Sequence, residues 1–200
     1  MQPTGRFAVI GNVELFKECY TRLSRQKNLD PLAGAAPHYF EERVMTTAIA
    51  VIGAVGWLAL TFGAAALGAR FLPDEWYRQL NKPTWNPPDA IFAPVWALLY
   101  LLMAASAWLV WRRYGISGAP LPLTLFVVQL LLNAAWTWLF FGHHLILGAL
   151  IDIVVLWVLI LTTLISFWNV ELWAGLLLTP YLAWVSFATV LNWSIWRTNR

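Results

Sequence analysis

Three polar side chains recur at four-residue intervals within an otherwise apolar stretch. Gln129, Asn133 and Thr137 share one face of any helix that contains them, because positions i, i+4 and i+8 lie above one another. If this stretch crosses a membrane, that face must turn toward protein or ligand, since an unsatisfied amide is costly in lipid. The stripe therefore predicts either hydrogen bonds between helices or contact between Asn133 and a ligand.

A lone carboxylate and a second polar stripe follow further along the chain. Asp152 lies about two turns into the apolar run that begins after the pair of histidines at 143 and 144. A membrane-buried acid is a functional hypothesis by default, although a position near the interface would also allow hydration or pairing. Trp184, Ala188 and Asn192 share one helical face, on which Asn192 could simply satisfy a neighbouring helix.

Tryptophan is the most unusual feature of the composition, with 14 residues in 200. Four of these residues lie near the ends of apolar runs, where an indole is favoured at the membrane interface: Trp111, Trp168, Trp173 and Trp196. Trp136, Trp157 and Trp184 instead fall well inside apolar runs. A buried indole N–H needs a partner there, so these three side chains could face a ligand.

The segment 81–96, NKPTWNPPDAIFAPVW, contains four prolines. Proline fixes its own backbone angle and restricts the residue before it, so this loop loses little entropy on ordering and enters the next helix at a set angle. Pro88 and Pro94 lie at or near the first turns of that helix, where a missing N–H costs least. The segment predicts a stiff lid over a site or, alternatively, a purely structural interfacial loop.

The elements that position these residues follow from hydropathy. The chain is 60% hydrophobic and 12% charged, more apolar than soluble domains usually are. A spanning helix needs about 20 mostly apolar residues. Five runs meet this requirement and predict an all-α integral membrane protein with five transmembrane helices: 46–69, 90–111, 121–141, 145–167 and 172–196. Short connections make most of these helices antiparallel neighbours.

Several function classes find no support in the sequence. The 13 basic and 10 acidic residues form no basic patch, so nucleic acid is not an expected partner. Cys19 is the single cysteine, which excludes an internal disulfide and a cysteine-rich metal site. No catalytic triad, metal-ligand cluster, phosphate loop or paired carboxylate is present. His143 and His144 fall in a short polar turn, where solvated histidines are expected rather than haem ligands.

The chain divides into an N-terminal extension, 1–44, and a five-helix membrane domain, 45–200. Apolar and basic residues alternate at helical spacing in 13–25, which suits an interfacial amphipathic helix, and 28–40 has the composition of a linker. The extension could equally be dispensable. Basic residues near the helix ends weakly favour a cytoplasmic first loop and C-terminus, with the two termini on opposite sides.

Three motifs carry a resemblance to a known family. They are PDEWYRQLNKPTWNPPDAIFAPVWALLY at 73–100, QLLLNAAWTWLFFG at 129–142 and LLLTPYLAWVSFATVLNWSIW at 176–196. In this order among five apolar runs, they resemble the translocator protein family, also called tryptophan-rich sensory proteins or peripheral-type benzodiazepine receptors. The resemblance covers about 45–197 and leaves the N-terminal extension outside.

This resemblance implies a five-helix bundle, often dimeric, with an internal ligand pocket roofed by the first loop. It also implies that the protein is a membrane receptor or sensor of tetrapyrroles, protoporphyrin IX or haem, or of similar hydrophobic molecules, and that it regulates porphyrin handling or transport. Porphyrin or haem would then be a ligand, and no cofactor is required. The alternative is enzyme-like breakdown of porphyrin, dependent on light or oxidant, in which pocket tryptophans take part. Membrane lipid is the other expected partner, and a homodimer is implied.

The resemblance also assigns residues by position. Trp85 and Pro87 match lid residues, and Trp96 matches a wall residue that donates a hydrogen bond to ligand. The other matching pocket positions are Asn133, Trp184 and Ala188, and Trp136, next to Asn133 on the helix, could present its ring to a flat ligand. Trp96 and Trp184 are the candidate redox groups of the enzyme alternative.

One departure from the animal members of the family concerns sterol. In VLNWSIWR, Trp193 stands where the cholesterol-recognition motif has tyrosine, which makes sterol a doubtful ligand. A bacterial cell membrane is the expected location, with the mitochondrial outer membrane as the alternative.

Overall fold

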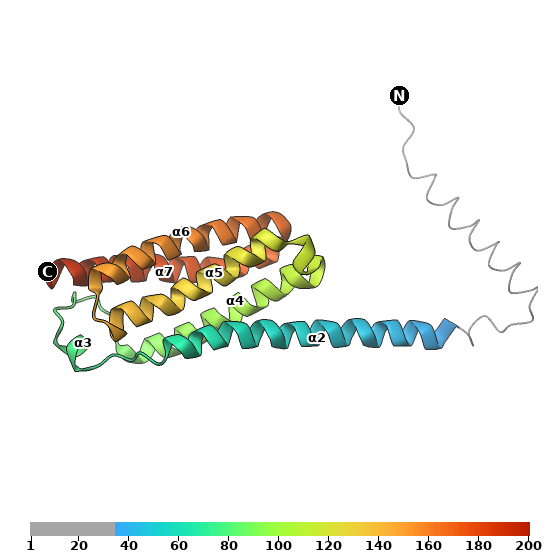
Figure 1. Ribbon diagram of the computed structural model, residues 1–200, viewed down its shortest axis with the longest axis horizontal. Coiled ribbons are helices and arrows are strands. Elements are labelled where there is room, and N and C mark those ends of the chain that lie inside the picture. The colour runs from blue at the N-terminus through green and yellow to red at the C-terminus, as the bar shows by residue number, and fades with distance from the viewer. Residues whose placement is uncertain (1–34) are drawn as a thin grey trace, which may run out of the picture. The chain divides into compact units, whose positions relative to one another are not determined.

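The computed structural model describes residues 35–200, and this part of the chain is helical with no strand (Figure 1). Its elements in chain order are α2 (Ala35–Gly68), α3 (Glu75–Gln79), α4 (Asp89–Gly118), α5 (Pro120–Thr137), the π-helix η1 (Trp138–Gly142), α6 (Ile146–Val170) and α7 (Leu172–Thr198). The predicted amphipathic helix lies outside the described residues. The predicted linker, 28–40, overlaps the start of α2, so its residues from Ala35 onward are helical.

Five helices in the described part of the chain are long and apolar enough to cross a membrane, which confirms the all-α, five-span prediction. They are Thr47–Gly68, Asp89–Gly118, Pro120–Gly142, Ile146–Val170 and Leu172–Thr198. The second span continues well past its predicted end at 111, because the polar residues that follow remain helical as far as Gly115, where φ is +65°. Glycine adopts this left-handed conformation without the steric cost that other residues have.

Within the unit Ala50–Arg200, α7 packs against both α6 and α4, and α5 packs against α6 (Figure 1). α6 and α7 approach closely at Gly175, where a Cβ atom would lie 2.8 Å from the Cα of Trp168. Ser106 of α4 donates to the carbonyl of Ala174 at 2.6 Å. Small side chains and buried hydroxyl groups therefore bring these helices together, as is usual where lipid surrounds the protein.

Contacts at both ends of its membrane-spanning part hold α2 to the other helices. A Cβ atom at Gly53 would lie 1.8 Å from the Trp111 ring, so a larger residue there would have to displace that ring. Trp108 Nε1 donates to the carbonyl of Ala50 at 2.9 Å. Toward the other end, a Cβ atom at Gly68 would lie 2.9 Å from Thr137 Oγ1. Gly68, one of the small residues suited to close helix packing, is therefore used inside the bundle.

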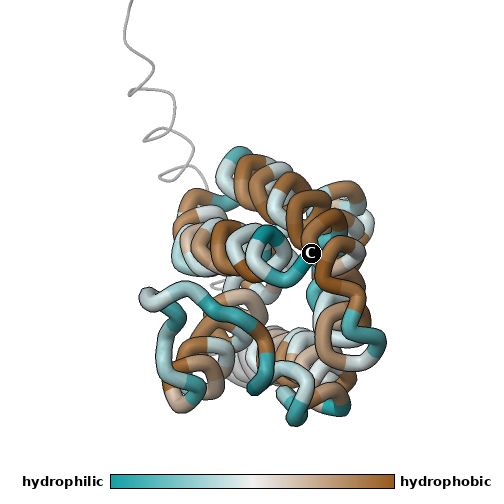
Figure 2. The backbone as a smooth tube through the Cα atoms, turned by 90° about the vertical axis from the view of Figure 1, so that its left-hand side faces the viewer, coloured by the Kyte–Doolittle hydropathy of each residue, from teal (hydrophilic) through white to brown (hydrophobic). Residues whose placement is uncertain are grey.

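Hydrophobic residues make up most of the helices of the bundle, and hydrophilic residues gather mainly at its end. Brown, hydrophobic segments run along the helices in the view from the loop end, whereas teal, hydrophilic residues gather in the connecting segment and at the chain end (Figure 2). Large apolar side chains such as Ile52, Leu131 and Ile151 are more than half exposed. Such side chains face lipid in a five-span bundle, and the interior holds aliphatic and aromatic side chains together with a few buried polar ones.

Candidate functional site: an aromatic cavity inside the bundle

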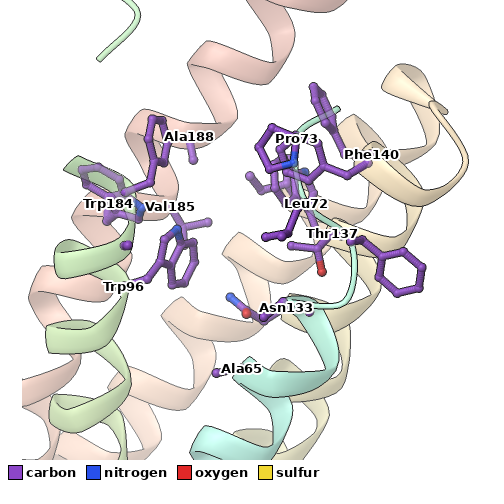
Figure 3. A pocket seen from close by; sticks show the side chains of 18 of the residues that line it. Ala65, Leu72, Pro73, Trp96, Asn133, Thr137, Phe140, Trp184, Val185 and Ala188 are labelled. Atoms are coloured by element: carbon purple, nitrogen blue, oxygen red, sulfur yellow. The ribbon is translucent and has the colours of Figure 1, made fainter. Parts of the chain in front are cut away.

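A cavity of about 600 Å³ lies inside the bundle, and every membrane-spanning helix contributes to its wall. This volume falls within the range of about 300–1,000 Å³ that is typical of small-molecule sites. Figure 3 shows two facing groups of side chains with Asn133 between them: Trp96, Trp184, Val185 and Ala188 on one side, and Leu72, Pro73, Thr137 and Phe140 on the other. The lining is mainly apolar and aromatic, which suits a flat hydrophobic molecule.

Five of the seven residues predicted to bind ligand line this one cavity: Trp96, Asn133, Trp136, Trp184 and Ala188. They come from α4, α5 and α7, so residues far apart in sequence meet at one site. Trp85 and Pro87 do not line the cavity. Trp85 is 46% exposed, and its ring meets the edge of Phe187 at 5.8 Å between centroids. Direct contact between either of these two residues and a ligand stays a prediction.

Four tryptophans inside the bundle, at positions 96, 136, 157 and 184, differ in how their N–H groups are used. Trp136 Nε1 donates to Asn192 Oδ1 at 3.0 Å, and Trp157 Nε1 donates to Ser186 Oγ at 2.7 Å. Trp157 is not a lining residue, so its expected exposure to a ligand is not seen. Trp96 and Trp184 line the cavity and make no hydrogen bond with any residue in the described part of the chain. Their indole donors are therefore the ones free for a ligand.

Asn192 and Asn133 show how the polar stripes are satisfied. Asn192 Nδ2 donates to the carbonyl of Ile146 at 3.2 Å, so this amide joins α7 to α6 while it also lines the cavity. Asn133 is 5% exposed, and its amide bonds two buried tyrosines, Tyr100 and Tyr181. Gln129 is 1% exposed and lies outside the lining. The first stripe thus joins helices, and two of its members, Asn133 and Thr137, line the cavity, while contact between Asn133 and a ligand stays a prediction.

The first loop forms one end of the cavity, as the resemblance implied, but it does so through residues near its start. Leu72, Pro73 and Tyr77 are lining residues from this loop. Tyr77 packs edge-on against Phe141 with 5.3 Å between ring centroids. Lys82 Nζ lies over the Tyr77 ring, 4.1 Å from its centroid. Burial raises the pKa of the Tyr77 hydroxyl.

Two sets of contacts fix the position of this loop. Asp74 caps α3 by accepting the N–H of Tyr77 at 3.1 Å, and its other carboxylate oxygen lies 3.1 Å from His144 Nε2. At the far end of the loop, Asn81 N–H donates to Asn199 Oδ1 at 2.9 Å, and Asn199 Nδ2 donates back to the Asn81 carbonyl. The loop is thus tied both to the turn before α6 and to the end of α7.

Charged groups are nearly absent from the wall. Asp89, in the first turn of α4, is the one charged residue among the lining residues that the structure describes. Asp152 does not line the cavity, and its Oδ2 atom is buried with no hydrogen-bond partner in the described part of the chain. His143 and His144 lie in the outer turn, and no cluster within residues 35–200 could hold a metal ion. The wall therefore offers mainly aromatic and apolar surface with a few neutral polar groups.

Several lining residues were not singled out by sequence reasoning. Tyr100 follows Trp96 by one helical turn, so the i, i+4 rule applied from Trp96 would have found it. Phe62 of α2 lies 6.1 Å from Tyr100 between ring centroids, but nothing in its local sequence distinguishes it from lipid-facing residues. Leu72 and Pro73 precede the proline-rich segment, which drew attention to the later part of the loop.

Together, these features define a class of protein: a five-span membrane protein with a small-molecule cavity enclosed by its helices and its first loop. Sequence comparisons narrow this class. The model of the TspO/MBR family matches residues 48–197. The chain is 41% identical to "Protein CrtK" of Rhodobacter capsulatus over 140 residues, which cover 68% of this chain and 86% of that protein.

Two further relatives come from a bacterium and an animal. The "Tryptophan-rich sensory protein" of Cereibacter sphaeroides is 39% identical over 143 residues, 72% of this chain and 89% of the relative. The human "Translocator protein" is 40% identical over 138 residues, 66% of this chain and 82% of the relative. The chain belongs to the TspO/MBR family, as the three sequence motifs predicted.

Proposed function

We propose that this protein is a membrane receptor or sensor that binds a tetrapyrrole, such as protoporphyrin IX or haem, in the cavity of the helix bundle. The observation that carries the proposal is the pair of indoles on the cavity wall, Trp96 and Trp184, whose N–H groups have no partner in the described part of the chain. A flat, apolar macrocycle with polar substituents matches flat aromatic walls with free donors at their edges.

The aromatic arrangement around these indoles gives further support. Trp96 lies 5.5 Å from Tyr100 and 6.2 Å from Tyr181 between ring centroids, and Trp184 meets Phe92 at 5.8 Å. These contacts restrict how the two indoles can turn, so their surfaces are set before a ligand arrives. A preorganised site spends less of its binding free energy on ordering side chains.

The name of the Cereibacter sphaeroides relative describes it as sensory, which favours a receptor role for this chain as well. In this proposal, occupancy of the cavity regulates porphyrin handling or transport. We place the protein in a bacterial cell membrane, with lipid around its exposed apolar faces and a second copy as a partner. Because Gly56 and Gly63 of α2 have no atom near an added Cβ, the face that carries them has room for close approach by another helix.

Binding of protoporphyrin IX to the purified full-length protein in detergent, kept in darkness, tests this function. We expect saturable binding, seen as quenching of tryptophan fluorescence together with a shift of the porphyrin absorbance band. Trp184→Leu should weaken binding several-fold. Trp173→Leu is the matched control, since Trp173 is on the same helix but 66% exposed and outside the cavity. Absence of saturable binding, or equal effects of the two substitutions, would contradict the proposal.

A further inference from the structure

The hydroxyl group of Tyr100 occupies a distinctive place in the cavity wall. Tyr100 lies on α4, one helical turn after Trp96, and its hydroxyl donates to Asn133 Oδ1 at 2.5 Å. Both partners are lining residues, and both are at least nine-tenths buried. The hydrogen bond thus joins two residues of the cavity wall, of which Asn133 is labelled in Figure 3.

This hydrogen bond begins a chain in which every donor points the same way. Asn133 Nδ2 donates to the Tyr181 hydroxyl at 3.0 Å, and Tyr181 in turn donates to Gln129 Oε1 at 3.0 Å. This series of hydrogen bonds thus runs from α4 through α5 to α7 and returns to α5. A tyrosine hydroxyl has a single proton, so Tyr100 and Tyr181 have each used theirs.

One end of this series of hydrogen bonds has a free donor, and the other has a free acceptor. At the Gln129 end, Nε2 is a buried donor with no partner among the described residues. At the Tyr100 end, the phenol oxygen accepts no hydrogen bond from the described part of the chain, so only its lone pairs remain available. A hydroxyl that already donates into a chain becomes a better acceptor, because each hydrogen bond polarises the next.

We infer that Tyr100 is a specificity-determining residue whose phenol oxygen accepts a hydrogen bond from the ligand, so that the cavity selects flat apolar molecules carrying an N–H or O–H group. Asn133 is then a positioning residue: it holds the Tyr100 proton away from the cavity and leaves the lone pairs facing it. This inference deepens the proposed function and rests on its assignment of the cavity as the ligand site. In protoporphyrin IX, a pyrrole N–H or an undissociated carboxyl group supplies such a donor, and in haem only the carboxyl group can.

The two free indoles complete the recognition pattern. Trp96 and Trp184 can only donate, and Tyr100 can only accept, so the wall is complementary to a ligand with an acceptor and a donor at separate places on one frame. A ligand without the donor leaves the buried phenol oxygen without its second hydrogen bond. Sites built this way discriminate against analogues that lack a single polar hydrogen.

The test uses two small probes that differ by replacement of that hydrogen with a methyl group. 2-Naphthol carries an O–H donor on a flat apolar frame, and 2-methoxynaphthalene carries the same oxygen without the hydrogen. Both are titrated into the purified full-length protein and into Tyr100→Phe, in one detergent, by isothermal calorimetry. We expect Tyr100→Phe to weaken 2-naphthol binding about fivefold, the usual effect of one net hydrogen bond, and to change 2-methoxynaphthalene binding less than twofold.

Comparison of the two probes cancels their different partition into detergent, because each probe is compared between the same two proteins. Equal weakening of both probes, or no weakening of 2-naphthol, would overturn the inference. Failure of 2-naphthol to bind the wild-type protein would overturn it too. These outcomes are independent of the porphyrin titration: protoporphyrin IX could fail to bind while 2-naphthol shows the expected dependence on Tyr100, which would reject the proposed function alone.

A second measurement needs no substitution, in case Tyr100→Phe does not fold. Wild-type protein with 13C-labelled tyrosine reports hydroxyl hydrogen bonding through the Cζ resonance of each tyrosine ring. 2-Naphthol should shift one buried tyrosine resonance that 2-methoxynaphthalene leaves in place. Identical shifts with the two probes would show that the phenol oxygen accepts nothing from the ligand.

Discussion

Oδ2 of Asp74 lies 3.1 Å from Nε2 of His144, and this contact joins the first loop to the turn that precedes α6. The rings of Trp76 and His144 stack beside it with 4.0 Å between centroids. The same carboxylate caps α3 through the N–H of Tyr77. That backbone hydrogen bond is the main reason the pKa of Asp74 lies below its ordinary value of 3.8, and His144 lowers it further.

The lowered pKa of Asp74 sets the sign of a pH dependence. Its contribution to loop stability is fully present above pH 3.8 and is lost as the pH falls through the lower pKa of the folded state. We expect residues 71–80 to lose protection from amide hydrogen exchange below about pH 4, after correction for the intrinsic exchange rate. Asp74→Ala should show the same loss at neutral pH, whereas full protection in this variant would contradict the assignment of Asp74 as the anchor.

Gly53 and Gly56 form a matched pair for testing how α2 packs. A Cβ atom at Gly53 would overlap the Trp111 ring, while nothing lies within 4 Å of a Cβ atom at Gly56. Gly53→Ala should therefore destabilise the protein by about 1–3 kcal/mol through overpacking. In the detergent-solubilised monomer Gly56→Ala should be neutral or slightly stabilising, because alanine favours the helix. Thermal unfolding in detergent distinguishes the two, and equal melting temperatures would show that α2 does not pack against Trp111.

Asn133→Ala tests whether the amide acts on the ligand directly or through Tyr100. The substitution strands hydrogen-bonding groups of two buried tyrosines, so we expect porphyrin binding to weaken by about 1–3 kcal/mol. In a Tyr100→Phe background, Asn133→Ala should reduce the porphyrin affinity clearly less, because the Tyr100 hydroxyl that Asn133 positions is already absent. Additive losses in this double-mutant cycle would mean that Asn133 contacts the ligand itself.

Removal of residues 1–44 tests the role of the N-terminal extension. All lining residues in the described part of the chain lie between Phe62 and Ile195, and the family model matches from residue 48 onward. We therefore expect truncation before Met45 to leave the affinity for protoporphyrin IX unchanged. A large loss of affinity in the truncated protein, at unchanged melting temperature, would show that the extension takes part in the site.

The number and type of helices could be predicted from sequence because a membrane imposes a single strong rule: about 20 apolar residues per span. The site was harder, because most lining residues are apolar and carry no local mark. Asn133 and Asn192 could be found since an amide in an apolar run stands out. Phe62 could not, because a cavity-facing phenylalanine and a lipid-facing one look alike in sequence.

The tryptophans show a second limit of sequence reasoning. Position within a span indicates that an indole is buried, but not which atom receives its N–H. Trp157 and Trp184 both lie within predicted spans, yet Trp157 donates to Ser186 while Trp184 has no partner in the described residues. Whether an indole N–H finds a partner depends on which side chains of the neighbouring helix lie opposite it, and that is fixed only when the helices pack together.

The last prediction separates binding from catalysis and concerns the same two free indoles. Trp96 and Trp184 present flat apolar surfaces whether or not chemistry follows, so their presence alone does not decide between a sensor and an enzyme. Phenylalanine at both positions keeps an aromatic surface but removes the N–H donors and the easily oxidised indole rings. We expect the Trp96→Phe, Trp184→Phe double variant to bind protoporphyrin IX with modestly lower affinity.

If the protein breaks down porphyrin in light, this double variant should retain the ligand and lose that activity. The measurement is the decay of the porphyrin absorbance band against illumination time, at matched occupancy, beside a protein-free sample. Decay with wild-type protein no faster than in the protein-free sample would remove the enzyme alternative and leave the receptor. Equal acceleration by wild type and variant would show that other groups carry the redox chemistry, because neither indole would then be required for electron transfer to or from the bound ring.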